Sequence, residues 1–278
     1  MGVVIGLDIG GSTTKTVALR GKTVIGYQVV TANDVVASAY GALGKFLNHH
    51  RLSPKDLDCV MVTGVGSTYL TGPLLGVPTV KVEEFISIGL GGSYMAGLDK
   101  AVVVSMGTGT AYVRVEGGEV KHLIGSGVGG GTLLGLSRCL LGTRDISRFN
   151  ELAASGNLSK IDLTVADISH SDVGLGKDVT ASNFGKVMDI PSEQDLAIGI
   201  TNLVFQSLGT LAVAIAKSEQ TKDVIFTGNM TQIPTGRDML RVVSKLYDFN
   251  FVIPENAEYA TAIGAALQGL SDHDRSEK

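Results

Sequence analysis

The sequence contains few cysteines and no cysteine motif. Its two cysteines are Cys59, within DLDCVMV, and Cys139, within LSRCLLG, and neither belongs to a C-x-x-C pair or a cluster with histidine. This pattern excludes a disulfide framework and a cysteine-based metal site. Both apolar surroundings predict reduced, buried cysteines in a cytoplasmic protein.

Clusters of basic residues and long apolar runs are also missing. There are 23 Lys and Arg against 27 Asp and Glu, which gives a net charge of −4 without a basic run, so nucleic acid is not an expected partner. No apolar run approaches the roughly 20 residues of a membrane-spanning helix. The first residues, MGVVIGLDIGG, lack the basic stretch and cleavage site of a secretion signal. We expect a cytoplasmic protein without a membrane segment.

The chain is rich in apolar residues and in clustered glycines. Its 278 residues are 44% hydrophobic and 18% charged, enough for two domains with cores of their own. The 37 glycines gather in short clusters, whereas there are only 6 prolines. Clustered glycine indicates places where the backbone approaches a ligand closely.

The two halves of the chain begin with the same pattern. Strands are expected over 3–7, 15–19 and 24–30, with a glycine-rich loop after the first and a turn before the third. Strands over 101–105, 111–115 and 120–124 repeat this order, which indicates an internal duplication. Helices are expected over 34–50, 85–98, 132–141, 146–155, 195–217, 237–247 and 257–269. The polar stretch 156–177 reads as a loop, and the charged tail 271–278 as frayed.

The strands expected over 3–7 and 101–105, and a further strand expected over 223–227, are followed by glycine turns at Gly10–Gly11, Gly107–Gly109 and Gly228. Ligands of α/β sheets bind at the carboxyl ends of strands, and such turns present backbone N–H groups that suit a polyphosphate. Asp8 adds a carboxylate of the kind that a phosphate-bound Mg²⁺ takes. A P-loop or Rossmann motif is absent, since there is no GxxxxGK[ST] and the glycines of 127–131 do not follow the first strand of a βαβ unit.

Three motifs together resemble the superfamily of acetate and sugar kinases, Hsp70 and actin: LDIGGSTTK at 7–15, SMGTGT at 105–110 and VIFTGN at 224–229. The resemblance implies a duplicated α/β actin-like ATPase fold with a ribonuclease H-like core, in which residues 1–98 and 99–278 enclose ATP in a central cleft. Within the superfamily, the segments GGGTLLGL at 129–136, DVTASNFG at 178–185 and ENAEY at 255–259 are similar to type II and eukaryotic-type pantothenate kinases.

That resemblance implies ATP and Mg²⁺ as cofactors, with Asp8 as the metal ligand. The residues that it assigns to the nucleotide are Asp8, Gly10, Gly11, Ser12, Thr13, Lys15, Thr108, Gly109, Gly130, Gly131, Thr132, Leu133, Leu134, Gly228 and Asn229. The helix that begins near Gly130 is expected to lend its N-terminal N–H groups and dipole to ATP. The alternatives are that Asp8 only stabilises its turn and that Lys15 is a solvent-facing strand residue.

The acceptor side depends on three further residues. Glu84 matches the carboxylate that serves the family as base for the pantothenate hydroxyl, whereas Glu83 beside it reads as a helix-end acid. Asn183 is either a hydrogen-bond donor to the substrate or the N-cap of a following turn. His122 stands where the family has an arginine, and an imidazole cannot reproduce the bidentate fork of a guanidinium.

The expected function is therefore the ATP-dependent phosphorylation of pantothenate in the first step of coenzyme A synthesis, by a homodimer. One alternative is an ATPase activator of the 2-hydroxyacyl-CoA dehydratase type, which would need cluster-bridging cysteines that this chain does not supply. The substitution at His122 also allows a non-catalytic regulator that binds nucleotide or coenzyme A. A sugar kinase is a weaker alternative, because no acidic sugar-binding motif is found.

Overall fold

The computed structural model describes residues 2–11, 13–31, 34–169, 176 and 179–276. Two mixed sheets of five strands carry the fold. The first sheet, in spatial order, contains β3 (Thr23–Val30), β2 (Thr14–Arg20), β1 (Val3–Ile9), β4 (Leu57–Thr63) and β5 (Thr79–Lys81). The second contains β8 (Glu119–Ser126), β7 (Thr110–Glu116), β6 (Lys100–Met106), β11 (Asp223–Thr227) and β12 (Asn250–Val252).

The same topology occurs in both sheets. In each, the first three strands of the unit are antiparallel neighbours, and two later strands then add in parallel to the other side of the first strand. The predicted duplication and α/β class are thus confirmed. Each first strand is a continuous apolar run because helices cover both faces of its sheet.

The helices divide between these faces. They are α1 (Val35–His50), α2 (Glu84–Ala96), α3 (Gly130–Leu141), α4 (Ile146–Ser155), α5 (Val165–Ile168), α6 (Glu193–Ser218), α7 (Pro234–Tyr247) and α8 (Ala260–Ser276). Short 3₁₀ turns span Pro54–Asp56, Val65–Tyr69, Leu158–Lys160, Asn229–Gln232 and Ala257–Tyr259. On the first sheet, α1 packs against one face of β1 and α8 against the other.

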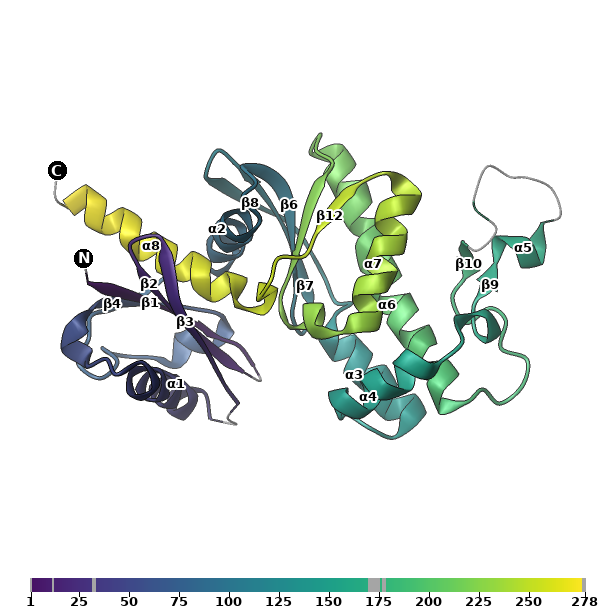
Figure 1. Ribbon diagram of the computed structural model, residues 1–278, viewed down its shortest axis with the longest axis horizontal. Coiled ribbons are helices and arrows are strands. Elements are labelled where there is room, and N and C mark those ends of the chain that lie inside the picture. The colour runs from purple at the N-terminus through teal and green to yellow at the C-terminus, as the bar shows by residue number, and fades with distance from the viewer. Residues whose placement is uncertain (1, 12, 32–33, 170–175, 177–178, 277–278) are drawn as a thin grey trace.

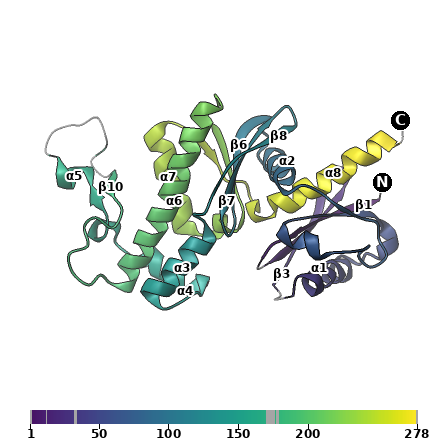
Figure 2. The ribbon, with the colours of Figure 1, turned by 180° about the vertical axis from the view of Figure 1, so that it is seen from behind.

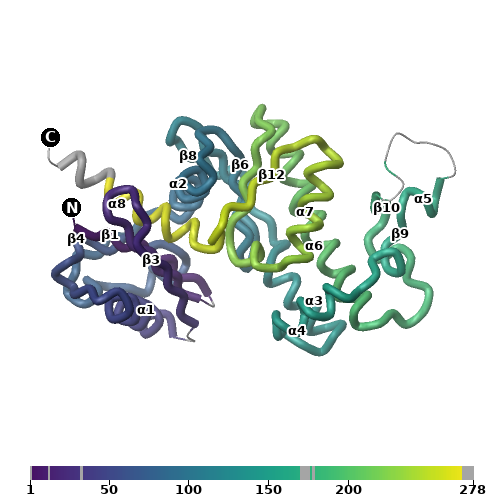
Figure 3. Tube along the Cα trace, in the orientation of Figure 1, coloured from purple at the N-terminus to yellow at the C-terminus, as the bar shows by residue number. Residues whose placement is uncertain are grey.

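Two helices each pack against the sheet formed by the other half of the chain. The C-terminal helix α8 lies on β1, β2 and β4 of the first sheet, while α2 lies on the second sheet beside β6, β7 and β8. Figure 3 shows α8 running from the second sheet back along the first. A boundary at residues 98 and 99 therefore does not separate the two packing units, because each sheet is covered by a helix from the other half of the chain.

The helices α2 and α8 touch backbone to backbone at the centre of the molecule (Figure 1). A Cβ on Gly91 would lie 1.8 Å from the carbonyl oxygen of Ala260, and one on Gly264 would lie 1.8 Å from that of Ser87. Only glycine fits at such a crossing. The pair therefore connects the helix on the second sheet with the helix on the first.

Three expectations about regular structure were wrong. The polar stretch 156–177 contains β9 (Leu163–Thr164) and α5, because the carboxylate of Asp167 accepts hydrogen bonds from the N–H and hydroxyl of Thr164, both at 2.8 Å. In the tail, α8 continues to Ser276. Finally, α6 is long and apolar enough to span a membrane, although 61% of the relevant stretch is buried inside the protein, as in a core helix.

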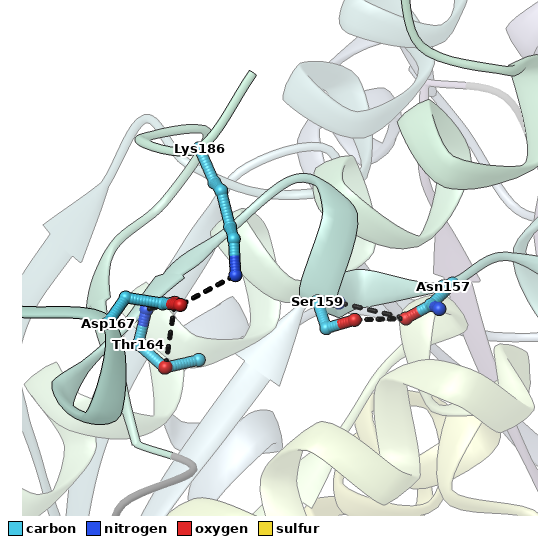
Figure 4. Close-up of polar contacts among 5 residues, drawn as sticks. All are labelled: Asn157, Ser159, Thr164, Asp167 and Lys186. Atoms are coloured by element: carbon cyan, nitrogen blue, oxygen red, sulfur yellow. Dashed lines mark hydrogen bonds and ion pairs between the residues drawn. The ribbon is translucent and has the colours of Figure 1, made fainter. Parts of the chain in front are cut away.

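Residues 157–169 and 179–192, here called the arm, extend from the N-terminal end of α6. The arm contains β9, α5 and β10 (Thr180–Ser182) and lies at the end of the molecule opposite the first sheet (Figure 2). Figure 4 shows its local polar contacts: the Lys186 ammonium donates to Asp167 at 2.6 Å, and Asn157 accepts from the N–H and hydroxyl of Ser159. The Lys186 hydrogen bond, with those from Thr164, lowers the pKa of Asp167 to about 2.

Candidate active site

A cleft of about 770 Å³ lies where the two sheets meet, at the carboxyl ends of β1, β6 and β11. The residues that line it come from both sheets and from the helices that cross between them. Of the residues predicted from sequence, the cleft brings together Asp8, Gly10, Gly11, Thr13, Lys15, Glu84, Thr108, Gly109, His122, Gly228 and Asn229. Ser12 lies outside the described residues.

The first glycine loop joins β1 to β2 and brings a carboxylate close to an ammonium group. Asp8 and Lys15 pair directly across the two strands, and their side chains lie 3.7 Å apart, both almost fully buried. Burial raises the pKa of Asp8, whereas the Lys15 ammonium lowers it by a smaller amount. The loop itself is closed by a hydrogen bond of 3.0 Å from the Gly10 N–H to the Thr13 carbonyl.

Gly64, at the end of β4, is part of the same corner. Its φ of +82° lies in the left-handed region, and a Cβ there would be 2.7 Å from an Asp8 carboxylate oxygen and 2.6 Å from the Ile9 carbonyl oxygen. Glycine is therefore required for β4 to pass this close to the carboxylate. The residue that follows, Val65, lines the cleft from this side.

The second glycine loop, Gly107–Gly109, joins β6 to β7 in the corresponding place of the second sheet. The Gly107 N–H donates to the Gly109 carbonyl at 2.9 Å, which folds the loop tightly. The N–H groups of Gly130 and Gly131 donate to the carbonyls of Gly107 and Thr108, each at 2.9 Å. The start of α3 thus stabilises the loop through these two backbone hydrogen bonds.

These hydrogen bonds bear on residues 130–134, which were expected to contact the nucleotide. The amides of Gly130 and Gly131 are already occupied by the loop, so they are not free donors for a nucleotide in this structure. The Thr132 hydroxyl donates to the Gly127 carbonyl and accepts from the Gly129 N–H. Leu133 is buried in the second core, against which Leu134 also packs. None of residues 130–134 lines the cleft, and they support the loop that does.

The third turn, after β11, places Gly228 against the second loop. Its φ is +91°, and a Cβ would lie 2.5 Å from the carbonyl oxygen of Met106, at the end of β6. The Gly228 N–H donates to the Ala257 carbonyl at 3.1 Å. Gly228 and Asn229, which were expected to bind the nucleotide, both line the cleft.

Glu84 is the first residue of α2, and its side chain lines the cleft with Asp8 and Lys15. Burial by the surrounding walls raises the pKa of Glu84, and the negative charge of Asp8 raises it further, while Lys15 lowers it. Glu83 is the N-cap residue, makes no side-chain capping bond and does not line the cleft. The two neighbouring acids therefore differ in place as the sequence suggested.

The electrostatics of Glu84 lead to a prediction for the free protein. Titrated by ¹³C NMR, its carboxylate should show a pKa above the ordinary glutamate value of about 4.3. Lys15→Met should raise this pKa further, because the favourable cation is lost, and Asp8→Asn should lower it, because the competing anion is lost. Shifts of opposite sign, or a wild-type pKa at or below the ordinary value, would contradict the geometry. Glu84→Gln assigns the resonance.

His122, on β8, lies at the same end of the cleft as Glu84. Its imidazole stacks on the ring of Phe85, with ring centroids 4.0 Å apart and planes inclined by 24°. Both side chains are partly exposed to the cleft. The ring that replaces the family's arginine is thus held by the residue next to Glu84.

Asn183 does not line the cleft, and the structure gives its side chain another partner. Its amide nitrogen donates to Asp162 at 3.1 Å and to Gln206 at 2.9 Å. Asp162 is buried and also accepts from Asn202 at 2.6 Å and from the Phe184 N–H at 2.9 Å. Asn183 is the first residue of a turn over 183–186 that follows β10. It fastens the arm to α6.

Several cleft residues were missed from sequence. Phe85 and Ile88 follow Glu84 on α2, and the i to i+4 spacing of Glu84 and Ile88 was a usable signal for a shared helix face. Thr261, on α8, reaches the cleft only because that helix returns to the first sheet, which no local pattern announces.

Such a cleft is suited to transfer of a phosphoryl group. Glycine loops allow a polyphosphate to approach the backbone, a buried lysine offers positive charge, and a carboxylate with a raised pKa can accept a proton from a hydroxyl. Among the described residues no group of three or more His, Cys, Asp or Glu could hold a metal ion by itself. Asp8 fits the single-carboxylate role of Mg²⁺ sites that share the ion with substrate phosphates.

Comparison with known proteins agrees with these features. The family model described as Fumble matches residues 100–268. A type II pantothenate kinase of Staphylococcus haemolyticus is 25% identical over 277 residues, covering 94% of this chain and 98% of its own length. Pantothenate kinase 1 of rice is 35% identical over 136 residues, which is 46% of this chain but only 20% of that longer protein.

Among solved structures, the ADPNP-bound activator of 2-hydroxyisocaproyl-CoA dehydratase from Clostridium difficile superimposes with a TM-score of 0.71. It covers 99% of this chain and 97% of its own, at 17% sequence identity. At that identity the match establishes the actin-like fold alone.

Proposed function

Because the chain belongs to the Fumble family, that of the type II pantothenate kinases, we propose that it phosphorylates pantothenate with ATP to give 4′-phosphopantothenate. The observation that carries the proposal is the position of Glu84. Its carboxylate shares one cleft with the two glycine loops and with the Asp8–Lys15 pair. Donor phosphates and an acceptor hydroxyl can therefore meet beside a base.

The proposed reaction assigns one role to each group. Glu84 takes the proton of the 4′-hydroxyl as its oxygen bonds to the γ-phosphorus, while the bond from that phosphorus to the β,γ-bridging oxygen breaks and ADP leaves. The raised pKa of Glu84 brings it nearer to neutrality, where a general base is most effective. The loops of Gly10–Gly11 and Gly107–Gly109 hold the phosphates, and Lys15 adds positive charge.

The proposal also includes a bound magnesium ion, a cytoplasmic location and a homodimeric state. Mg²⁺ bound with ATP would neutralise charge on the transferring phosphoryl group, and Asp8 is the residue that would hold it, directly or through water. The buried Asp8 carboxylate, which lies 3.7 Å from the Lys15 ammonium, supports this role. ATP as donor supports a cytoplasmic site of action. The homodimer rests on the family resemblance, and sedimentation equilibrium would test it.

The dehydratase-activator alternative is less supported. It rests on similarity of fold, whereas the relatives that match nearly the whole chain are kinases. Cys59 lies in β4 and forms a contact with Met61. Cys139 lies on α3 and is exposed, so the expectation that both cysteines are buried was wrong. Neither lines the cleft.

The product itself provides the test. After incubation with MgATP and pantothenate, ³¹P NMR should show a phosphomonoester coupled to the two protons of the 4′-carbon, together with ADP. Inorganic phosphate as the sole new phosphorus species, with pantothenate unchanged, would mean that the protein is an ATPase and would refute the proposal.

A further inference from the structure

The cleft has two accessible apolar side chains among its polar lining. Most of the lining consists of glycine, hydroxyl and charged residues, but Val65 and Phe85 are apolar and exposed, whereas Ile88, only 2% exposed, belongs to a core cluster. Val65 is 66% and Phe85 39% exposed, although both are large hydrophobic residues. Apolar side chains that remain accessible inside a polar cleft suggest an apolar part of the ligand.

Phe85 is held in place from two sides. Its ring stacks on the His122 imidazole at a centroid distance of 4.0 Å, and its backbone belongs to the first turn of α2. One turn later α2 touches β8 again, since a Cβ on Gly89 would lie 2.6 Å from a methyl carbon of Val120. The helix α2 and the strand β8 are therefore in contact along this stretch. The stacked rings of Phe85 and His122 form one wall of the cleft.

This wall stands beside the proposed base. Phe85 is the next residue after Glu84, and Ile88 lies one turn further on the face of α2 that carries Glu84. A hydroxyl that donates its proton to Glu84 must therefore have its own carbon skeleton close to apolar surface. An acceptor with bare polar groups around that hydroxyl would leave them facing Phe85 without hydrogen bonds.

The proposed acceptor has the complementary shape. In pantothenate the carbon that bears the reacting hydroxyl is attached to a quaternary carbon with two methyl groups. We propose that Phe85, stacked on His122, is the specificity-determining residue that binds this geminal dimethyl group and so aligns the 4′-hydroxyl with Glu84. The inference rests on the proposed function and specifies how the cleft selects its acceptor.

The test compares two acceptors and four proteins. The acceptors are pantothenate and its analogue with both methyl groups replaced by hydrogen. The proteins are wild type, Phe85→Ala, Phe85→Leu and the control Tyr40→Ala, which removes a similarly exposed aromatic ring from α1, outside the cleft. Each is measured for kcat/KM with both acceptors and for binding of a non-hydrolysable ATP analogue.

The expected result is a loss of discrimination confined to position 85. Wild type and Tyr40→Ala should prefer pantothenate by roughly 10- to 200-fold, the range for small apolar groups in a fitted pocket. In Phe85→Ala the preference should fall to within about 3-fold, since the lost contact no longer distinguishes the acceptors. Phe85→Leu, which stays apolar, should retain most of it. ATP-analogue affinity should stay within about 2-fold throughout.

The results that would overturn this inference differ from the result that would refute the proposed function. Equal loss of kcat/KM for both acceptors in Phe85→Ala would show that Phe85 only supports α2, and a wild type without preference would likewise overturn the inference. If Phe85→Ala fails to fold, Phe85→Ser decides instead: its preference should fall to within about 3-fold, and a preference equal to that of wild type would overturn the inference. A wild type that phosphorylates neither acceptor would instead refute the proposed function itself.

Discussion

Glu84→Gln is expected to lower kcat by about 100-fold or more while ATP affinity stays close to wild type. Glutamine keeps the size and hydrogen-bonding capacity of the side chain but cannot accept the hydroxyl proton. The effect should fall on turnover because the side chain lines the cleft at the end where the acceptor is proposed to bind. Steady-state kinetics with pantothenate, and calorimetric titration with an ATP analogue, measure the two quantities separately.

Glu83→Gln is the matched control. It alters an adjacent acid that makes no capping bond and does not line the cleft, so kcat should stay within about 2-fold of wild type. A larger loss of kcat in Glu83→Gln than in Glu84→Gln would show that Glu84 is not the base. A turnover that survives both substitutions would leave the reaction without a base in this cleft.

Gly107→Val is expected to lower affinity for ATP by on the order of 100-fold without lowering the melting temperature by more than a few degrees. Its backbone φ lies outside the left-handed region, and the nearest atom to an added Cβ is the Gly109 carbonyl oxygen, at 3.7 Å. The protein therefore has room for the side chain. Because Gly107 lines the cleft, the valine would occupy space proposed for the phosphates.

Gly127→Val controls for the loss of a glycine near the same loop. An added Cβ there has no neighbour within 4 Å, its φ is also permissive, and the residue does not line the cleft. Melting temperature and ATP-analogue affinity should both stay near wild type. Equal affinity in folded Gly107→Val and wild type would remove this loop from the nucleotide site.

Local patterns were sufficient to predict the strands and their duplication. The runs 3–7 and 101–104 are apolar because both faces of each sheet are covered, and the glycine turns that follow mark the carboxyl ends. The exchange of α2 and α8 between sheets was not predictable in this way. It depends on contacts such as Gly91 with Ala260, which join segments far apart in the chain.

The candidate site was predicted where a short motif carries its own geometry. Asp8 and Lys15 meet because a tight loop pairs their strands in register. The roles expected for Gly130 and Asn183 depended on which partner each group would find. The Gly130 N–H bonds to Gly107, and the Asn183 amide bonds to the buried Asp162, an acid that no sequence motif identified. Partner choice of this kind is settled only by tertiary packing.

The most direct test of the central claim is acceptor-dependent release of ADP. The purified protein is incubated with MgATP and, in separate reactions, pantothenate, pantetheine, N-acetylated sugars or no acceptor, and ADP is followed by a coupled assay. Pantothenate should stimulate ADP release far above the rate without acceptor, and Glu84→Gln should abolish that stimulation. ADP release that is equal with and without pantothenate, or that responds to a sugar instead, would contradict the account.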